Sequence, residues 1–174
     1  NSFLMELKEI EAFINKIPDH PKPGILFYDI STLILDNEAF GESLRLMCDY
    51  VSKLEIDLIA GIDARGFIFA SGIAFKLNKG LVMLRKKNKL PGKTISQEYN
   101  LEYGKDTIEI NVNIKNKRVL LVDDLLATGG TAHAAIKLLK KSGAKVKSFL
   151  CLIELSFLNG KQALDVPFKS LIRY

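Results

Sequence analysis

The chain has 174 residues, of which 48% are hydrophobic and 26% are charged, and its net charge is +5. These values are typical of one soluble globular domain, residues 1–174, with a substantial core. No apolar run approaches the ~20 residues of a membrane-spanning helix. Residues 1–8 also lack the pattern of a secretory signal, so we expect a cytoplasmic protein with no membrane partner.

The cysteines and the positive charge restrict the compartment and the partners. Cys48 and Cys151 are isolated in apolar segments, which indicates buried free thiols in a reducing compartment rather than a disulfide. A net positive charge suits either a nucleic acid or a small polyanionic substrate. Five cations lie close together, whereas the charges elsewhere are mixed in sign: Arg85, Lys86, Lys87, Lys89 and Lys93.

The N-terminal region, residues 1–35, is predicted to form a helix and a small hood. Apolar residues recur at helical spacing and predict a helix over residues 4–17: Leu7, Ile10, Ile14 and Ile17. Prolines at positions 18, 21 and 23 then impose an extended path. The next stretch, P-K-P-G-I-L-F-Y-D at residues 21–29, is either an ordinary turn packed on the core or a cover over a flat base.

Helices and strands alternate in the next region. Asp36 can cap a helix, whose buried face is marked by Phe40, Leu44, Met47 and Val51. Residues 58–62 predict a buried strand, D-A-R-G at 63–66 a tight turn, and the following residues a helix. Such a turn places backbone donors at the carboxyl end of a strand, where α/β folds bind ligands. Arg65 is therefore either a surface residue in a salt bridge or part of a site.

The basic cluster directly follows a third predicted strand, residues 81–84. A charge run is usually a solvated loop, but several cations at this edge of a sheet would suit a ligand with several negative charges. Residues 91–106 are rich in glycine and polar side chains and are predicted to form a loose hairpin with 107–112 as the return strand. A long exposed segment of this kind is a candidate lid.

The most informative stretch is residues 118–131, R-V-L-L-V-D-D-L-L-A-T-G-G-T. Its apolar run, 119–122, predicts a strand buried on both faces. Asp123 and Asp124 follow the strand, and a helix is expected to begin near Thr131 or Ala132. Between them, Gly129 and Gly130 can adopt positive φ and let backbone N–H groups approach an anion. The helix N-terminus adds further donors and a partial positive charge.

The two halves of this stretch suit two parts of one ligand. Thr128 and Thr131 offer hydroxyl donors to phosphate, whereas carboxylates at 123 and 124 suit sugar hydroxyls or a hydrated Mg²⁺. A phosphate beside a diol describes a ribose 5-phosphate. The alternative is that the aspartates only cap a turn that the glycines permit. Neither G-x-x-x-x-G-K-[ST] nor G-x-G-x-x-G is present, which argues against a P-loop NTPase and a dinucleotide site.

The rest of the chain continues the alternation. A helix over 133–141, ended by Gly143, precedes a long buried strand at 146–155, and residues 158–174 are expected to add a short helix and an edge strand. The pattern predicts an α/β fold, with a mostly parallel twisted sheet flanked by helices on both faces. His20 and His133 show no spacing for metal or triad chemistry, so no role is assigned to them.

In their order, these motifs resemble those of the type I phosphoribosyltransferases, and D-D-L-L-A-T-G-G-T resembles the form in adenine phosphoribosyltransferases in particular. The resemblance extends from Pro21 to Tyr174. It implies the type I phosphoribosyltransferase fold with an N-terminal hood and a flexible hairpin loop. The implied reaction joins adenine to 5-phosphoribosyl 1-pyrophosphate (PRPP) and gives AMP and pyrophosphate. The resemblance also implies a homodimer, and Mg²⁺ that contacts mainly the substrate, near Asp123 and Asp124.

The resemblance also implies roles for individual residues. Adenine would meet Leu26, Phe27 and Tyr28, although family members usually carry arginine at the last position. Pyrophosphate would meet four cationic side chains: Arg65, Arg85, Lys86 and Lys89. In the family, the arginine that matches Arg85 is often donated across a dimer interface. The ribose 5-phosphate would meet the motif itself: Asp123, Asp124, Leu125, Ala127, Thr128, Gly129, Gly130 and Thr131.

Two further features follow from the resemblance. Glu102 and Tyr103 match the catalytic glutamate and the neighbouring tyrosine of the flexible loop. The family's loop after the second strand usually holds a cis peptide bond that does not involve proline, so the same is expected at Asp63–Ala64.

Two rival functions stay open. The first is a phosphoribosyltransferase for hypoxanthine/guanine, xanthine or orotate, against which residues 21–29 argue. The second is a regulator that senses PRPP and binds nucleic acid, which a basic chain would suit. A chain of 174 residues leaves no room for an added DNA-binding domain, and Glu102 lies where catalysis needs it. We therefore expect only small-molecule partners and no nucleic acid.

Overall fold

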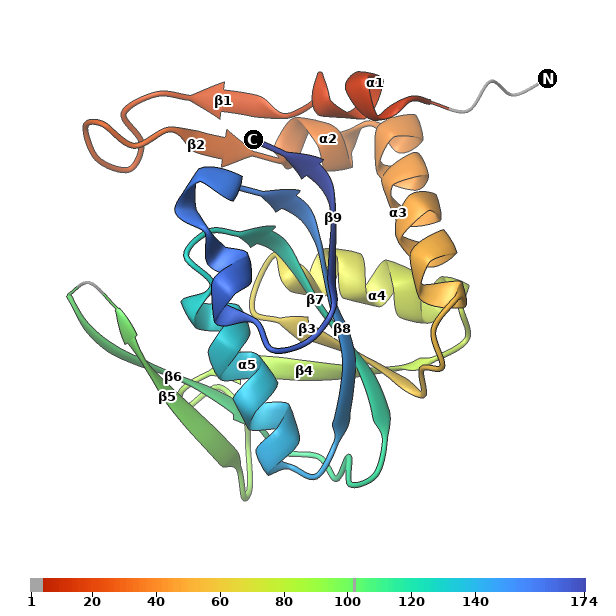
Figure 1. The fold of residues 1–174 in the computed structure, drawn as a ribbon, viewed down its shortest axis with the longest axis vertical. Helices are drawn as coiled ribbons and strands as arrows, with labels where there is room; N and C mark the ends of the chain where they lie inside the picture. The colour runs from red at the N-terminus through yellow and green to blue at the C-terminus, as the bar shows by residue number, and fades with distance from the viewer. Residues whose placement is uncertain (1–4, 102) are drawn as a thin grey trace. The chain divides into compact units, whose positions relative to one another are not determined.

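The computed structural model describes residues 5–101 and 103–174. The chain forms two compact units, a smaller one that ends at Leu46 and a larger one, Met47–Tyr174. Figure 1 labels their helices and strands. Within the described ranges, no helix is both long and apolar enough to cross a membrane.

The smaller unit contains a two-stranded antiparallel sheet. Its first elements are α1 (Leu7–Glu11), β1 (Asn15–Ile17) and β2 (Phe27–Asp29). The predicted helix over residues 4–17 is wrong beyond Glu11, because residues 15–17 pair with 27–29 through their backbones. Pairing with a segment beyond the prolines thus overrides the local helical periodicity.

Two helices follow this sheet, α2 (Ser31–Leu35) and α3 (Asn37–Ser52). The backbone N–H of Ala39 donates to the Asp36 carboxylate at 2.8 Å, which confirms the predicted cap. Of the four apolar residues expected on the buried face of α3, Met47 and Val51 are buried, whereas Phe40 and Leu44 are only half-buried.

The larger unit is built on a seven-stranded sheet in the order β5-β6-β4-β3-β7-β8-β9. The parallel strands are β4 (Gly80–Lys86), β3 (Leu58–Ile62), β7 (Arg118–Leu126), β8 (Lys145–Glu154) and β9 (Phe168–Arg173). The hairpin of β5 (Ile95–Leu101) and β6 (Gly104–Ile110) joins antiparallel to β4. The prediction of a mostly parallel α/β sheet is confirmed.

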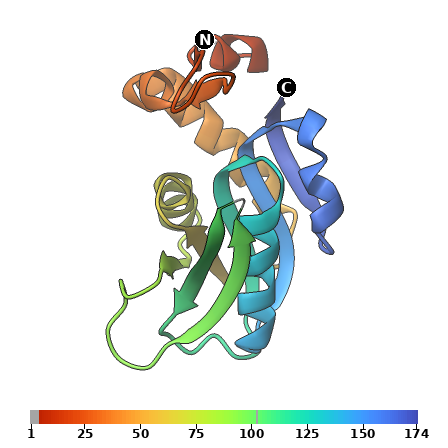
Figure 2. The same ribbon diagram turned by 90° about the vertical axis from the view of Figure 1, so that its left-hand side faces the viewer.

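Helices α4 (Gly66–Lys76) and α5 (Gly130–Lys141) cover opposite faces of this sheet (Figures 1 and 2). Neighbouring residues of a strand point to opposite faces. In β3, a Cβ on Gly61 would lie 2.8 Å from the Cβ of Ala70 in α4. Its neighbours Ala60 and Ile62 belong to the core that includes the buried face of α5. The central strands are therefore buried on both sides, as their continuous apolar runs predict.

The hairpin is more regular than the sequence predicts. Strands β5 and β6 pair from Ile95↔Ile110 to Leu101↔Gly104, so the return strand begins at Gly104 rather than at residue 107. Cross-strand backbone pairing orders residues that are individually polar and weakly patterned. Glu102, which lies between the two strands in the sequence, is outside the described residues.

The C-terminal tail contains two short 3₁₀ helices, η1 (Ser156–Leu158) and η2 (Gly160–Ala163), before the edge strand β9. The expected short helix and edge strand are thus confirmed. Gly143 follows Ser142, the C-cap of α5, and has φ +86°, as expected of a residue that ends a helix. Both cysteines are free and buried.

Candidate active site

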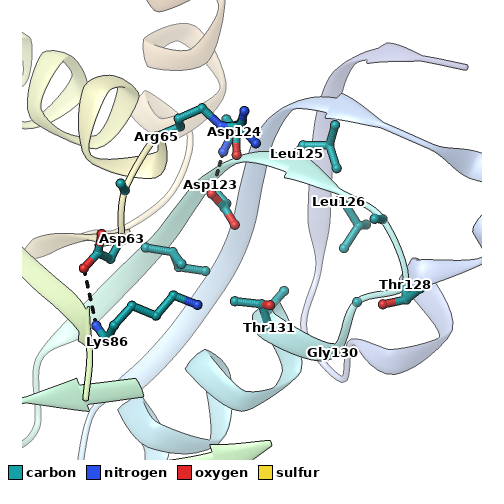
Figure 3. Close-up of a pocket in the computed structure, with 15 residues that line it drawn as sticks. Asp63, Arg65, Lys86, Asp123, Asp124, Leu125, Leu126, Thr128, Gly130 and Thr131 are labelled. Carbon is teal, nitrogen blue, oxygen red and sulfur yellow. Dashed lines mark hydrogen bonds and ion pairs between the residues drawn. The ribbon is translucent and has the colours of Figure 1, made fainter. Parts of the chain in front are cut away.

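A pocket lies at the carboxyl ends of β3 and β7, which are parallel neighbours in the sheet. It is lined by residues from the loop after β3, from the end of β4 and from the end of β7 through the start of α5 (Figure 3): residues 62–65, Lys86 and residues 123–132. The D-A-R-G turn and the D-D…T-G-G-T motif, more than fifty residues apart in sequence, therefore meet in one place.

The acidic pair belongs to β7 itself, which continues to Leu126. The expectation that these residues follow the strand is wrong, because pairing with β8 persists to Leu126↔Glu154. Asp124 is buried and accepts from Nε of Arg65 at 2.8 Å. Asp123 accepts the backbone N–H of Asp124 at 2.8 Å through Oδ1. Strand pairing and these two contacts hold both carboxylates in fixed positions.

The Asp124 carboxylate is close enough to Asp123 to affect the pKa of Asp123. Withdrawal from water, and next the adjacent Asp124 carboxylate, raise the pKa of Asp123 well above its ordinary value, while Arg65 opposes this shift. A group that favours its protonated form in this way is stabilised as an anion by hydroxyl donors or by a cation. The pair is thus suited to a polyol or to a metal-bearing ligand.

The loop that follows, residues 127–131, has the geometry of an anion site. Gly129 has φ +88° and serves as the N-cap of α5, which begins at Gly130, slightly earlier than the expected Thr131 or Ala132. The first N–H groups of a helix have no partner within it, and the helix dipole adds partial positive charge. In Figure 3, Thr128, Gly130 and Thr131 border the pocket on the side away from Arg65. Hereafter residues 127–131 are called the phosphate loop, after the ligand that we propose for them below.

The turn after β3 carries Arg65, which is the N-cap of α4. Its side chain is 46% exposed although it contacts Asp124. The guanidinium can therefore contact Asp124 and a ligand in the pocket at the same time. The peptide bond Asp63–Ala64 is cis, as the resemblance implies.

Lys86 enters the pocket from β4, which extends beyond its predicted end at residue 84. Nζ donates to the Tyr99 hydroxyl and to the Asp106 carboxylate, both at 2.9 Å. Burial lowers the pKa of Lys86, but the hydrogen bonds to Asp106 and Tyr99 outweigh it and the net shift is upward. Sequence reasoning missed both hairpin residues, since only the register of β5 with β6 brings Tyr99 opposite Asp106.

Other expected site residues do not line this pocket. Arg85 donates from Nε to Oδ2 of Asp63 at 3.2 Å, and Lys89 lies past the end of β4, where its backbone N–H donates to the Lys86 carbonyl. Tyr103 is 82% exposed on the hairpin. The proposed base contacts lie in the smaller unit, where Leu26 is exposed, Phe27 stacks edge-on with His20 and Tyr28 is buried.

Comparison with known proteins agrees with this geometry. The family model of the phosphoribosyl transferase domain matches residues 34–165. The chain belongs to the phosphoribosyl transferase family. It is 52% identical to the adenine phosphoribosyltransferase of Acidiphilium cryptum over 172 residues, covering 98% of this chain and 99% of that protein. The closeness over almost all of both sequences places it among the adenine phosphoribosyltransferases.

Solved structures of the same enzyme share the fold. The adenine phosphoribosyltransferase of Thermoanaerobacter pseudethanolicus matches with a TM-score of 0.94 and 44% identity, over 97% of this chain and 100% of that one. The Saccharomyces cerevisiae enzyme, complexed with an imino-altritol bisphosphate and adenine, matches with a TM-score of 0.89 and 33% identity, over 95% and 97% of the two chains. The predicted type I fold is confirmed.

Proposed function

We propose that this chain transfers the 5-phosphoribosyl group of PRPP to adenine and releases AMP and pyrophosphate. The observation that supports this most directly is that an acidic pair and a Gly/Thr loop at a helix N-terminus line one and the same pocket. This combination complements a pentose that carries a phosphate. The yeast relative was crystallised with adenine and a bisphosphate of similar chemistry.

In the proposed complex the phosphate loop holds the 5′-phosphate. Ala127, Gly129 and Gly130 contribute backbone N–H groups, Thr128 and Thr131 contribute hydroxyls, and Leu125 packs beside the sugar. Asp123 and Asp124 accept hydrogen bonds from the ribose hydroxyls. Both groups of residues line one pocket, so a single sugar phosphate would reach them both.

The pyrophosphate lies nearest to Arg65 and Lys86, because these cations line the pocket beside the acidic pair. Charge-assisted hydrogen bonds from both stabilise it as it leaves ribose C1. As the bond to C1 weakens, the sugar acquires oxocarbenium character, and the fixed negative charge of the acidic pair complements it. Because strand pairing holds these carboxylates before the reaction, little reorganisation is needed.

Mg²⁺ fits this site as an ion shared with the substrate. Asp123 and Asp124 would be the carboxylates nearest to the ion, and because two carboxylates are a partial set for a cation that prefers oxygen ligands, its contacts would be mainly with the substrate. When bound, Mg²⁺ neutralises charge on the leaving pyrophosphate.

The hairpin supplies the proposed catalytic groups. Glu102 approaches the base and assists proton movement at its imidazole ring, with Tyr103 beside it. The β5–β6 hairpin contacts the pocket residue Lys86 through Tyr99 and Asp106, which places the hairpin beside the proposed pyrophosphate position. Closure of the hairpin excludes water from a cationic sugar that water would otherwise trap.

Adenine is assigned to Leu26, Phe27 and Tyr28. β2 holds the last two, so their backbone groups have fixed directions. Tyr28 replaces the arginine usual in the family, and because its side chain is buried we assign the base contact to the main chain there.

A homodimer is supported by the apolar face of β4. Leu81 and Met83 are exposed on one face of this strand, and α4, packed beside it, exposes Phe75 at 88%. Large exposed apolar groups of this kind mark interaction surfaces. Arg85 follows on the same face of β4, so in such a dimer it would lie at the interface, in keeping with the donated arginine that the family resemblance implies. Lys89 would add to the same cationic field.

The experiment that tests the function is a panel of bases incubated with PRPP and Mg²⁺, with nucleotide formation measured by chromatography. We expect AMP from adenine and at least about a hundredfold less product from hypoxanthine, guanine, xanthine or orotate. Product mainly from another base would favour the first rival function. Salt-sensitive oligonucleotide binding without AMP formation would favour the PRPP-sensing regulator.

The buried free thiols are consistent with the cytoplasmic location that we propose.

A further inference from the structure

Two glycines from distant parts of the larger unit lie back to back behind the phosphate loop. A Cβ on Gly129 would lie 2.5 Å from the carbonyl oxygen of Gly160 and 2.9 Å from the Cβ of Ala163. A Cβ on Gly160 would overlap the carbonyl oxygen of Ala127 and lie 3.1 Å from the backbone nitrogen of Gly129. The backbones of the phosphate loop and of η2 are therefore in direct contact, with no room for a side chain between them.

Residues 155–163, which contain η1 and η2 and are called the η segment below, are themselves held by several hydrogen bonds. The backbone N–H of Leu155 donates to the carbonyl of Leu126 at 2.9 Å, immediately before the phosphate loop. The hydroxyl and backbone N–H of Ser156 both donate to the carbonyl of Tyr174, at 2.6 and 2.8 Å. Nδ1 of His133, on the first turn of α5, lies 2.9 Å from the carbonyl oxygen of Ala163. The loop is thus held from before its start to just after its end.

We infer that Gly160 is a positioning residue for the 5′-phosphate. Residues 159–163 form a rear support that presses on the phosphate loop from the side away from the ligand. This support keeps Gly129 at φ +88° and aims the donors of residues 127–131 into the pocket. The inference rests on the proposed placement of the 5′-phosphate in this loop.

Because of this backbone contact, a side chain added at Gly160 should displace the phosphate loop rather than residues 159–163. A methyl group on Gly160 meets backbone atoms of Ala127 and Gly129, which cannot rotate away as a side chain would. The η segment cannot easily retreat, because Leu155, Ser156 and Ala163 are tied to the body of the unit. The strain is therefore relieved mainly by displacement of the phosphate loop, and displaced donors bind an anion less well.

The test compares AMP with adenosine, two ligands that differ only in the 5′-phosphate. Calorimetry gives the dissociation constants of both for the wild type and for Gly160→Ala. We expect AMP binding to weaken about tenfold or more and adenosine binding to change less than about twofold. In steady-state kinetics, KM for PRPP should rise more than kcat falls. Gly41→Ala is the matched control, because a Cβ there meets nothing within 4 Å.

A second variant covers the case in which Gly160→Ala does not fold. His133→Ala removes the hydrogen bond to Ala163 without adding an atom to the contact, and it should weaken AMP binding about threefold, again with little change for adenosine. Equal losses for the two ligands, or no loss, in a folded variant would overturn the role of the rear support. A wild type that binds AMP no more tightly than adenosine would instead refute the proposed phosphate placement.

Discussion

Replacing Gly66 with alanine tests whether the close approach of α4 to β7 sets the position of the acidic pair. A Cβ at residue 66 would lie 2.9 Å from the carbonyl oxygen of Val122, 3.0 Å from Oδ1 of Asp123 and 3.2 Å from the Cα of Asp123. Gly66 is the first residue of α4. Glycine is required there because of this contact, rather than for the tight turn that the sequence suggests.

The size of the effect follows from these distances. Carbon–oxygen contacts are ordinarily about 3.3 Å or longer, so α4 and β7 must separate by a few tenths of an ångström. β7 is paired on both sides, by β3 and β8, and resists the shift. Overpacking of this kind costs about 1–3 kcal/mol, and in a chain of this size each kcal/mol lowers Tm by about 2–4 °C. Displacement of Asp123 should also raise KM for PRPP about fivefold or more.

Thermal unfolding followed by circular dichroism, together with kinetics at varied PRPP, measures both effects. Gly41→Ala serves again as the control and should leave both values unchanged or raise Tm slightly, since it adds a better helix former in α3. A Gly66→Ala protein with the wild-type Tm and KM would refute the reasoning.

Three further predictions concern the site. Glu102→Ala should lower kcat about 10²–10⁴-fold and leave PRPP affinity, measured by calorimetry, nearly intact; normal turnover would remove Glu102 from the mechanism. At pH values above the raised pKa of Asp123, Asp123→Asn should raise the Tm of the ligand-free protein, because the wild-type carboxylate there ionises at a free-energy cost. At pH values below the ordinary carboxyl pKa, this gain in Tm should vanish. A Tm gain independent of pH would contradict this origin. Asp106→Asn should raise KM for PRPP about two- to threefold, since a partly exposed ion pair orients Lys86; a lower KM would show that Asp106 competes with pyrophosphate.

The amino-acid sequence by itself determined the order of the functional parts. An apolar run, an acidic pair, a Gly/Thr loop and a helix start are all local patterns, and each of them lies in the structure within a few residues of its predicted position. Local patterns are readable because backbone propensity and hydrophobic periodicity act over a few neighbouring residues. The same holds for the alternation of strands and helices that predicts the parallel sheet.

Only the tertiary structure decided where elements end and which distant residues meet. β7 carries the acidic pair because β8 continues alongside it, and the first helix stops at Glu11 because residues 15–17 pair with β2. The partners of Lys86 come from a hairpin, and the phosphate loop is backed by Gly160 from the tail. Each of these facts is a contact between segments far apart in the chain, whose free energy depends on the packed backbone and leaves no signal in the local sequence.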